Sequence, residues 1–256
     1  MIPGPAIYNS SREKIDTLVE GLETAPVTVV LVHGIGTDKH ETAGQFDDIS
    51  KGLHDKYRTI RFDFSGFGKS EGRMEDFDYY KHADDLKSVL DYVKQTFSGQ
   101  IYIVAQSMGT FITALLNPKG IERTVFMGIP NSNTSYIIEL ISKRWGSKPG
   151  AHIDMNGVSL VPRTSGAIQR FGAKFWTSLK NFNPVGAVTA FSKNTHLLIL
   201  HPLQDELVGQ QFLEAYKSIQ NVAIEHINGD HSFRKTEDRT ALIARIRTFF
   251  NSDTII

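Results

Sequence analysis

The sequence predicts an α/β fold in which helices flank a mostly parallel central sheet. Two observations support this class. Short apolar runs alternate with longer amphipathic stretches along most of the 256 residues, which is typical of a sheet with helices on both faces. The first run, residues 27–32, is continuously apolar, as expected of a strand buried on both faces.

The remaining strands follow in chain order, each separated from the next by a helix or by an insertion. Strands are expected at residues 27–32, 59–64, 101–105, 123–129, 195–201 and, more weakly apolar, 222–227. The clearest helices are expected at residues 44–57, 78–97 and 236–250. Reactive groups in such folds gather beyond the carboxyl ends of the strands, so loops at those ends are the places to search for a site.

The alternation stops between residues 131 and 190, which we interpret as a lid inserted over the sheet. The core would then consist of residues 1–130 and 191–256. Within the insertion, Asn156-Gly157 predicts a two-residue hairpin turn. Residues 166–182 place Ile168, Phe171, Phe175 and other apolar side chains at helical spacing, which predicts a helix.

Composition narrows the classes of partner. The chain has 28 basic and 28 acidic residues, which argues against nucleic acid as a partner. It has no cysteine, which removes disulfides and thiolate zinc sites. Without HExxH or a comparable ligand cluster, we expect no metal and no cofactor. The amino terminus lacks the features of a signal peptide, and no run approaches the roughly 18 apolar residues of a membrane span. We therefore expect a cytoplasmic protein.

The most informative motif is Ala105-Gln106-Ser107-Met108-Gly109. It lies between the apolar run 101–104 and the helix-like stretch 110–116. A serine held between small residues on a strand-to-helix turn has the form of a nucleophile elbow, GxSxG, with Ala105 in place of the first glycine. Alanine satisfies the steric requirement almost as well as glycine does. Ser107 is therefore the candidate nucleophile.

A serine nucleophile needs a base and an acid that orients the base, in the chain order Ser, Asp or Glu, His. Asp205 lies just after the strand at 195–201, with Glu206 as its adjacent competitor. We prefer Asp205 because Val208, three residues on, is expected to pin the loop while the acid points inward. His231, in a glycine-containing loop before the last helix, is the best candidate for the base.

His33-Gly34 ends the first buried strand and has the form of an oxyanion loop. The backbone amides of Ile35 and Met108 are the expected donors to the developing oxyanion, whereas His33 itself is expected to be structural. The segment Gly66-Phe67-Gly68-Lys69-Ser70 contains the GKS end of a phosphate-binding loop. The first glycine of that motif is replaced by Asp63, so we disfavour nucleotide binding.

The insertion also carries candidate substrate contacts. Its aromatic residues Trp145, Phe171, Phe175 and Trp176 are candidates, as is Gln106 in the turn, although packing within the insertion is the simpler explanation for any single aromatic. Residues 131–190 contain seven basic and two acidic side chains. Such a surface would favour anionic or carboxylate-bearing substrates by electrostatic steering.

Taken together, these motifs resemble the α/β-hydrolase superfamily, and within it the cinnamoyl/feruloyl esterase-like branch near the serine aminopeptidase and monoglyceride lipase group. The resemblance covers about residues 25–251 and rests on LVHGIG (31–36), RFDFSGFGKSEG (61–72), AQSMG (105–109), DELV (205–208) and GDHSF (229–233). In that family the RFDFSGFGKS segment is a structural turn. The branch also has an insertion with a hairpin and a helix that form the acyl pocket, a looser similarity.

The resemblance implies a serine hydrolase that cleaves carboxylic esters, with Ser107 as nucleophile, His231 as general base and acid, Asp205 as orienting acid, and an oxyanion hole at Ile35 and Met108. Two positions depart from the family pattern, Ala105 and Pro202, of which Pro202 could reshape the loop that presents Asp205.

The expected partner is a small-molecule ester, for which short-chain, aromatic and anionic esters are all candidates. Peptidase, monoacylglycerol lipase, thioesterase and acyltransferase activities remain open, as does a non-catalytic ligand-binding role. A monomer and a homodimer are equally compatible with the sequence.

Overall fold

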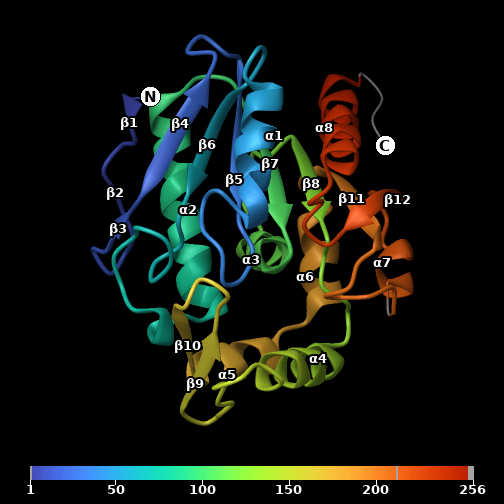
Figure 1. Cartoon of the computed structure of the whole chain (residues 1–256). Coiled ribbons are helices and arrows are strands. Elements are labelled where there is room, and N and C mark those ends of the chain that lie inside the picture. The colour runs from blue at the N-terminus through green and yellow to red at the C-terminus, as the bar shows by residue number, and fades with distance from the viewer. Residues whose placement is uncertain (1, 212, 253–256) are drawn as a thin grey trace.

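The computed structural model describes residues 2–211 and 213–252, and a twisted sheet lies at its centre (Figure 1). Its strands are β1 (Ile2–Pro3), β4 (Thr17–Gly21), β5 (Val27–Val32), β6 (Arg58–Phe62), β7 (Gln100–Gln106), β8 (Arg123–Met127), β11 (His196–Gln204) and β12 (Val222–Asp230). They lie in the order β1-β4-β6-β5-β7-β8-β11-β12. From β6 to β12 all neighbours pair in parallel, whereas β1 and β4 extend one edge antiparallel. The predicted strands and the mostly parallel sheet are confirmed.

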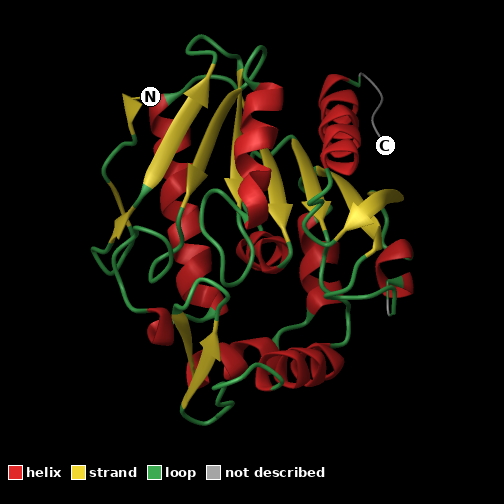
Figure 2. Cartoon of the chain, viewed as in Figure 1, coloured by secondary structure: helices red, strands yellow, loops and turns green. Residues whose placement is uncertain are grey.

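Helices cover both faces of this sheet (Figure 2). The helices of the body are α1 (Gln45–Leu53), α2 (Tyr79–Thr96), α3 (Met108–Leu116), α6 (Pro184–Phe191), α7 (Glu214–Lys217) and α8 (Thr236–Asn251). Two short 3-10 turns, η1 (Thr42–Gly44) and η2 (Met74–Asp76), and a small antiparallel pair, β2 (Ile7–Tyr8) with β3 (Lys14–Ile15), complete it. The helices predicted at 44–57, 78–97 and 236–250 are therefore confirmed as α1, α2 and α8, with ends that differ by a few residues.

The two faces of the sheet explain why its strands are apolar throughout. In β5, Val30 and Val32 point into a core shared with α2, α3 and α6. Val29 and Leu31 point to the opposite side, where α1 and α8 supply the apolar side chains. All four are fully buried, because alternate residues of a strand face opposite sides of the sheet. A continuous apolar run is the expected result when both sides are covered.

A separate layer lies beyond the carboxyl ends of the parallel strands (Figure 1). It contains α4 (Thr134–Gly146), the hairpin β9 (Val158–Pro162) with β10 (Ile168–Gly172), and α5 (Ala173–Asn181). The chain returns to the body at α6, which packs against α3. The layer is fastened to the body at η2, where the side chain of Arg170 binds Glu75 at 2.6 Å.

Two local expectations for this layer are wrong. The helix predicted over residues 166–182 begins only at Ala173, because residues 168–172 form strand β10 and pair with β9. Asn156-Gly157 does not form a two-residue hairpin turn, since His152 pairs with Leu160 across a wider connection. The Asp154 carboxylate holds that connection by accepting the backbone N–H groups of residues 156 and 157.

The loop that contains GKS is a structural turn around a buried aspartate. Asp63 is fully buried, and its carboxylate accepts the backbone N–H groups of Lys39 and Lys69 and the ammonium of Lys39, at 2.7–2.8 Å. The space at Gly68 is occupied by this carboxylate. These contacts fill the position where the phosphate-binding motif would need an open backbone cradle. Among the described residues, no helix is long and apolar enough to cross a bilayer.

Candidate active site

Ser107 occupies a strained turn between β7 and α3. Its backbone has φ 51° and ψ −122°, outside the regions that non-glycine residues ordinarily adopt. Its N–H is held by the carbonyl of Met127 at 2.9 Å. The turn brings α3 so close to β5 that a Cβ at Gly109 would lie 2.5 Å from the carbonyl oxygen of Val32. Glycine is therefore required at the second small position, whereas Ala105 fits at the first and is fully buried.

Asp205 and His231 come together at the ends of β11 and β12. The Nδ1 of His231 lies 2.8 Å from Oδ2 of Asp205, and both side chains are almost fully buried. The other oxygen, Oδ1, accepts the backbone N–H groups of Leu207 and Val208 at 2.9 Å. Asp205 thus has its carboxylate fixed by the loop that follows it and aimed at the imidazole.

The electrostatics of this pair favour an ionised acid. Burial alone would raise the pKa of Asp205, but the hydrogen bond from His231 and the N–H groups of Val208 and Leu207 hold the pKa below its ordinary value. Glu206 has different partners: its carboxylate accepts the backbone N–H of His231 and binds Arg234 at 2.7 Å. Of the two adjacent acids, Asp205 is therefore the one that contacts the imidazole.

Gln106 connects the serine turn to the histidine loop. Its Nε2 donates to the backbone carbonyl of His231 at 2.7 Å, and its side chain is buried. Gly128 lies between the two, where a Cβ would approach Cε1 of His231 to 2.9 Å. The hydroxyl of Ser107 bonds to no described residue. Gln106 lies outside the pocket lining, which makes it a support of the site in this structure.

The loop after β5 and the start of α3 bring Ile35 and Met108 to the same pocket. Ile35 and Met108 both line it together with Ser107, and Met108 is the first residue of α3, where backbone N–H groups lack helical acceptors. The loop is held by the buried carboxylate of Glu41, which accepts the N–H of Gly34 and the hydroxyl of Thr37. Amides at a helix start and in such a loop are suited to stabilise an oxyanion.

His33 lies beneath this loop as a neutral ring. Its Nε2 accepts the backbone N–H of Phe64 at 3.0 Å, so the proton is on Nδ1, which donates to the carbonyl of Gly34 at 2.8 Å. Burial lowers the pKa of His33, although the nearby carboxylate of Glu41 opposes the shift. The ring makes an edge contact with Phe64, with centroids 4.7 Å apart. These contacts assign His33 to loop support and leave no side-chain nitrogen free for substrate.

The neutral state of His33 predicts a pH dependence of stability. Because its pKa is lower in the folded than in the unfolded state, the unfolded chain gains this proton first as the pH falls below the ordinary value of 6.5. Stability from His33 is present above pH 6.5 and lost as the pH falls toward the folded-state pKa. The loss can reach about 1.4 kcal/mol per pH unit.

The test compares urea unfolding of the wild type and His33→Gln between pH 5 and 8. We expect the stability advantage of the wild type to shrink as the pH falls below 6.5. His54→Gln is the matched control, because His54 is exposed, and its effect should be nearly independent of pH. An advantage over His33→Gln that stays constant across this range would contradict a neutral buried His33.

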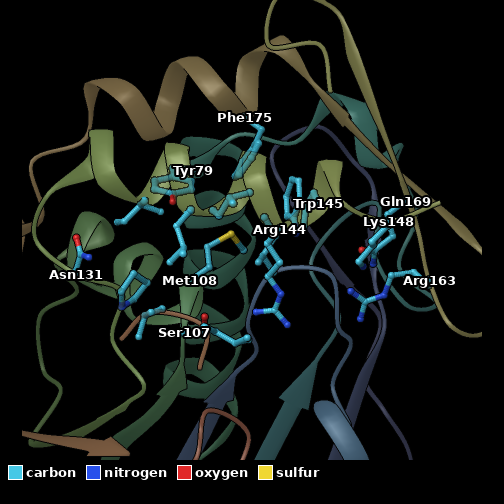
Figure 3. A pocket seen from close by; sticks show the side chains of 17 residues that line it. Tyr79, Ser107, Met108, Asn131, Arg144, Trp145, Lys148, Arg163, Gln169 and Phe175 are labelled. Carbon is cyan, nitrogen blue, oxygen red and sulfur yellow. The ribbon is translucent and has the colours of Figure 1, made fainter. Parts of the chain in front are cut away.

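The pocket next to Ser107 is enclosed by the layer that contains α4 and α5 (Figure 3). Of the four aromatic residues predicted to contact substrate, Trp145 and Phe175 line it. Phe171 and Trp176 pack behind them: Phe171 stacks on Trp145 with centroids 4.4 Å apart, and the indole N–H of Trp176 donates to Ser159. The structure thus divides these residues into a wall and its support.

Several lining residues were missed by the sequence reasoning. Tyr79 and the fully buried Asn131 both face the pocket, and the Nδ2 of Asn131 has no partner within the described chain. Asn131 follows β8, and a residue at the carboxyl end of a parallel strand is a signal that could have found it. Gln169 lines the pocket as well and donates from Nε2 to the carbonyl of Gly36 at 2.8 Å, which ties β10 to the loop after β5.

Pro202 sits where the sheet tolerates proline. It pairs with Ile227 of β12, and the register between these strands shifts immediately after it. On the other side, the pairing of β11 with β8 ends at Leu200, so Pro202 has a neighbouring strand on one side only. Proline is confined to such edges and irregularities because it cannot donate to the ladder. Pro202, which departs from the pattern of the resembled family, therefore lies at the irregularity of β11 that leads into the Asp205 loop.

Comparison with known proteins agrees with the fold. A family model described as alpha/beta hydrolase fold matches residues 27–151. Est1E from Butyrivibrio proteoclasticus, solved with ferulic acid bound, is 19% identical with a TM-score of 0.75, and the match covers 97% of this chain and 100% of that one. An esterase of Pyrococcus furiosus is 18% identical with a TM-score of 0.72, covering 95% and 88%. The esterase domain of a Rhodothermus marinus protein is 16% identical with a TM-score of 0.68, covering 94% and 93%. No curated protein matches the chain.

Proposed function

We propose that this chain, which has the α/β-hydrolase fold, is a serine hydrolase that cleaves carboxylic esters through an acyl-enzyme on Ser107. The observation that carries the proposal is the 2.8 Å contact between Asp205 and His231, joined to the Ser107 turn by the bond from Gln106 to the backbone of His231. The likeness to Est1E, which binds ferulic acid, and to the esterases of Pyrococcus furiosus and Rhodothermus marinus supports the same class of substrate.

In the first half of the reaction, Oγ of Ser107 attacks the carbonyl carbon of the ester while Nε2 of His231 takes its proton. Asp205 holds the ring with Nδ1–H toward its own carboxylate and stabilises the imidazolium that forms. The negative charge on the carbonyl oxygen is received by the amides of Ile35 and Met108. Collapse of this intermediate breaks the bond to the alcohol oxygen, which leaves with the proton from His231.

In the second half, water attacks the acyl-enzyme and gives a proton to His231. The second tetrahedral intermediate uses the same two amides. Its collapse releases the carboxylic acid and returns the proton to Ser107, so the enzyme ends unchanged. General base catalysis by a histidine contributes about 10²- to 10⁴-fold in such steps.

The layer of α4, β9, β10 and α5, which lies within the predicted insertion at 131–190, would act as the lid of this site. It supplies the apolar wall formed by Ile137, Trp145 and Phe175, and Gln169 joins it to the oxyanion loop. An enclosed wall of this kind excludes water and strengthens the electrostatic interactions near the serine. The substrate would be a small ester whose apolar part lies against this wall.

The proposal is tested by labelling and by a substrate panel. A fluorophosphonate probe should attach to Ser107, and peptide mapping should recover the label there. Aryl, short-chain and long-chain esters measured beside the matching amides and thioesters should show ester hydrolysis as the fastest reaction. A protein that binds these esters but takes no label would be a non-catalytic relative, and faster cleavage of amides or thioesters would replace the ester assignment.

A further inference from the structure

Three cationic side chains share the pocket of Ser107. Arg144, at the end of α4, Lys148, just after it, and Arg163, in the β9–β10 turn, all belong to its lining, which within the described chain contains no aspartate or glutamate. Figure 3 shows the guanidinium of Arg144 directed toward the end of the sheet that carries Ser107. In this view Lys148 and Arg163 lie next to Arg144, on the side away from Ser107. One wall of the pocket is therefore positively charged.

The acids around this wall are already bound to other cations. Glu206 is the acid that most raises the pKa of Arg144. Its carboxylate binds Arg234 at 2.7 Å and accepts the backbone N–H of His231. Glu75, on the far side of the hairpin, binds Arg170 at 2.6 Å. Within the described chain, Lys148 donates to one group, the neutral carbonyl of Pro162, at 3.1 Å. The three cations have no ion pair among the described residues.

The surroundings of these three cations favour the binding of an anion between them. Burial lowers the pKa of Lys148, and the neighbouring charges of Arg163 and Arg144 lower it further. Burial also lowers the pKa of Arg144, where Glu206 opposes the shift. Like charges held together in a half-enclosed space repel one another, and an oxyanion between them would relieve that repulsion while gaining charge-assisted hydrogen bonds.

The rest of the pocket indicates what accompanies this anion. Apolar side chains make up much of the remaining lining, namely Ile137, Leu140, Ile141, Trp145 and Phe175. A ligand that fills the pocket would place its reacting carbonyl at Ser107, an apolar portion along this wall, and an anionic oxygen group at the cations. Guanidinium groups match carboxylate and phosphate in two-pronged hydrogen bonding.

We propose that Arg144, Lys148 and Arg163 form an anion-binding subsite that selects esters carrying a carboxylate or a phosphate away from the scissile bond. The inference rests on the proposed ester hydrolysis at Ser107 and specifies its substrate class. It assigns the selectivity to three of the seven basic residues of the insertion. Arg170, for example, contributes to the total charge of the insertion but is paired with Glu75.

The kinetic test compares charged esters with neutral isosteres. The 4-nitrophenyl half-ester of glutaric acid and its methyl-capped form place the charge on the acyl side. 3-Acetoxybenzoate and its methyl ester place it on the alcohol side, and 3-acetoxyphenyl phosphate replaces the carboxylate by phosphate. We expect kcat/KM to be about 10-fold or more higher for the charged member of at least one pair, and this ratio to fall as salt is raised.

Variants connect that ratio to the subsite. Arg144→Gln, Lys148→Gln and Arg163→Gln should each reduce the ratio of charged to neutral turnover several-fold. Lys143→Gln is the matched control, because Lys143 lies beside Arg144 on α4 but is exposed and outside the pocket lining. This variant removes one positive charge and should leave the ratio unchanged. A wild-type ratio near one, or equal ratios in all four variants, would overturn the subsite.

A binding measurement separates this inference from the proposed chemistry. Calorimetric titration of Ser107→Ala with 3-acetoxybenzoate, 3-acetoxyphenyl phosphate and the neutral methyl ester needs no turnover. Tighter binding of an anion that is lost with Arg144→Gln supports the subsite even if no ester is hydrolysed, in which case the proposed function alone fails. The opposite result is that the wild type hydrolyses neutral esters and the probe labels Ser107, but binding shows no preference for an anion. That result would leave the proposed function standing and reject the subsite.

Discussion

Ser107→Ala is expected to reduce ester turnover by about four to six orders of magnitude, to the level of the residual catalysis that binding and the oxyanion hole can supply. The physical reason is that the acyl-enzyme cannot form without Oγ. The fold should be unaffected, because that hydroxyl bonds to no described residue and alanine fits wherever serine does. The measurement is kcat/KM with 4-nitrophenyl esters, beside thermal unfolding.

Ser218→Ala is the control for this experiment. Ser218 is an exposed serine remote from the pocket lining, and its loss should change neither turnover nor labelling. A Ser107→Ala protein that keeps wild-type turnover, or a fluorophosphonate label recovered on another residue, would remove Ser107 from the mechanism. It would also direct attention to a different nucleophile on the same fold.

Asp205→Asn is expected to lower kcat by about 10³- to 10⁴-fold. The carboxylate accepts from Nδ1 of His231 at 2.8 Å, whereas an asparagine amide can turn its NH₂ toward the ring and favour the tautomer with the proton on Nε2. That tautomer cannot take the proton of Ser107. The substitution also removes the negative charge that stabilises the imidazolium during the reaction.

The adjacent acid provides a matched control. Glu206→Gln removes one carboxylate from the same loop, but Glu206 contacts Arg234 and the backbone of His231 rather than its ring. We expect kcat to change by less than about tenfold, the size of a single modest hydrogen-bond effect. If Glu206→Gln proved the more damaging variant, the role of orienting acid would belong to Glu206.

Much of the fold follows from local sequence because burial on both faces leaves a continuous apolar run. Residues 27–32 form β5 as expected, and the amphipathic stretch at 78–97 forms α2. The insertion was harder to predict. Ile168, Phe171 and Phe175 have helical spacing, yet Ile168 and Phe171 lie in a strand, with Ile168 58% exposed and Phe171 fully buried.

The physical reason for that error is that pairing with β9 outweighed local spacing. Residues 168–172 gain a hydrogen-bonded partner across the short turn from Arg163 to Ala167, which no periodicity of their own reveals. Tertiary context commonly overrides weak local preferences of this kind. The same holds for Asn156-Gly157, where the side chain of Asp154, rather than a two-residue turn, organises the connection.

The sequence by itself determined the α/β class, the strand-to-helix turn at Ser107 and the chain order in which Ser107, Asp205 and His231 occur. These are properties of short segments, because a turn between a buried strand and a helix depends on a few adjacent residues. Gly109 illustrates the point, since its small size is visible in the motif and its necessity follows from the contact with β5.

The tertiary structure decided which groups meet. It brought Asp205 rather than Glu206 to the ring of His231, and it put Trp145 and Phe175 on the pocket wall with Phe171 and Trp176 behind them. It also separated the three cations of the pocket from those on the outside of the insertion. Such choices depend on the direction of each side chain after distant segments pack, and a difference of one residue along a loop turns a side chain toward another partner.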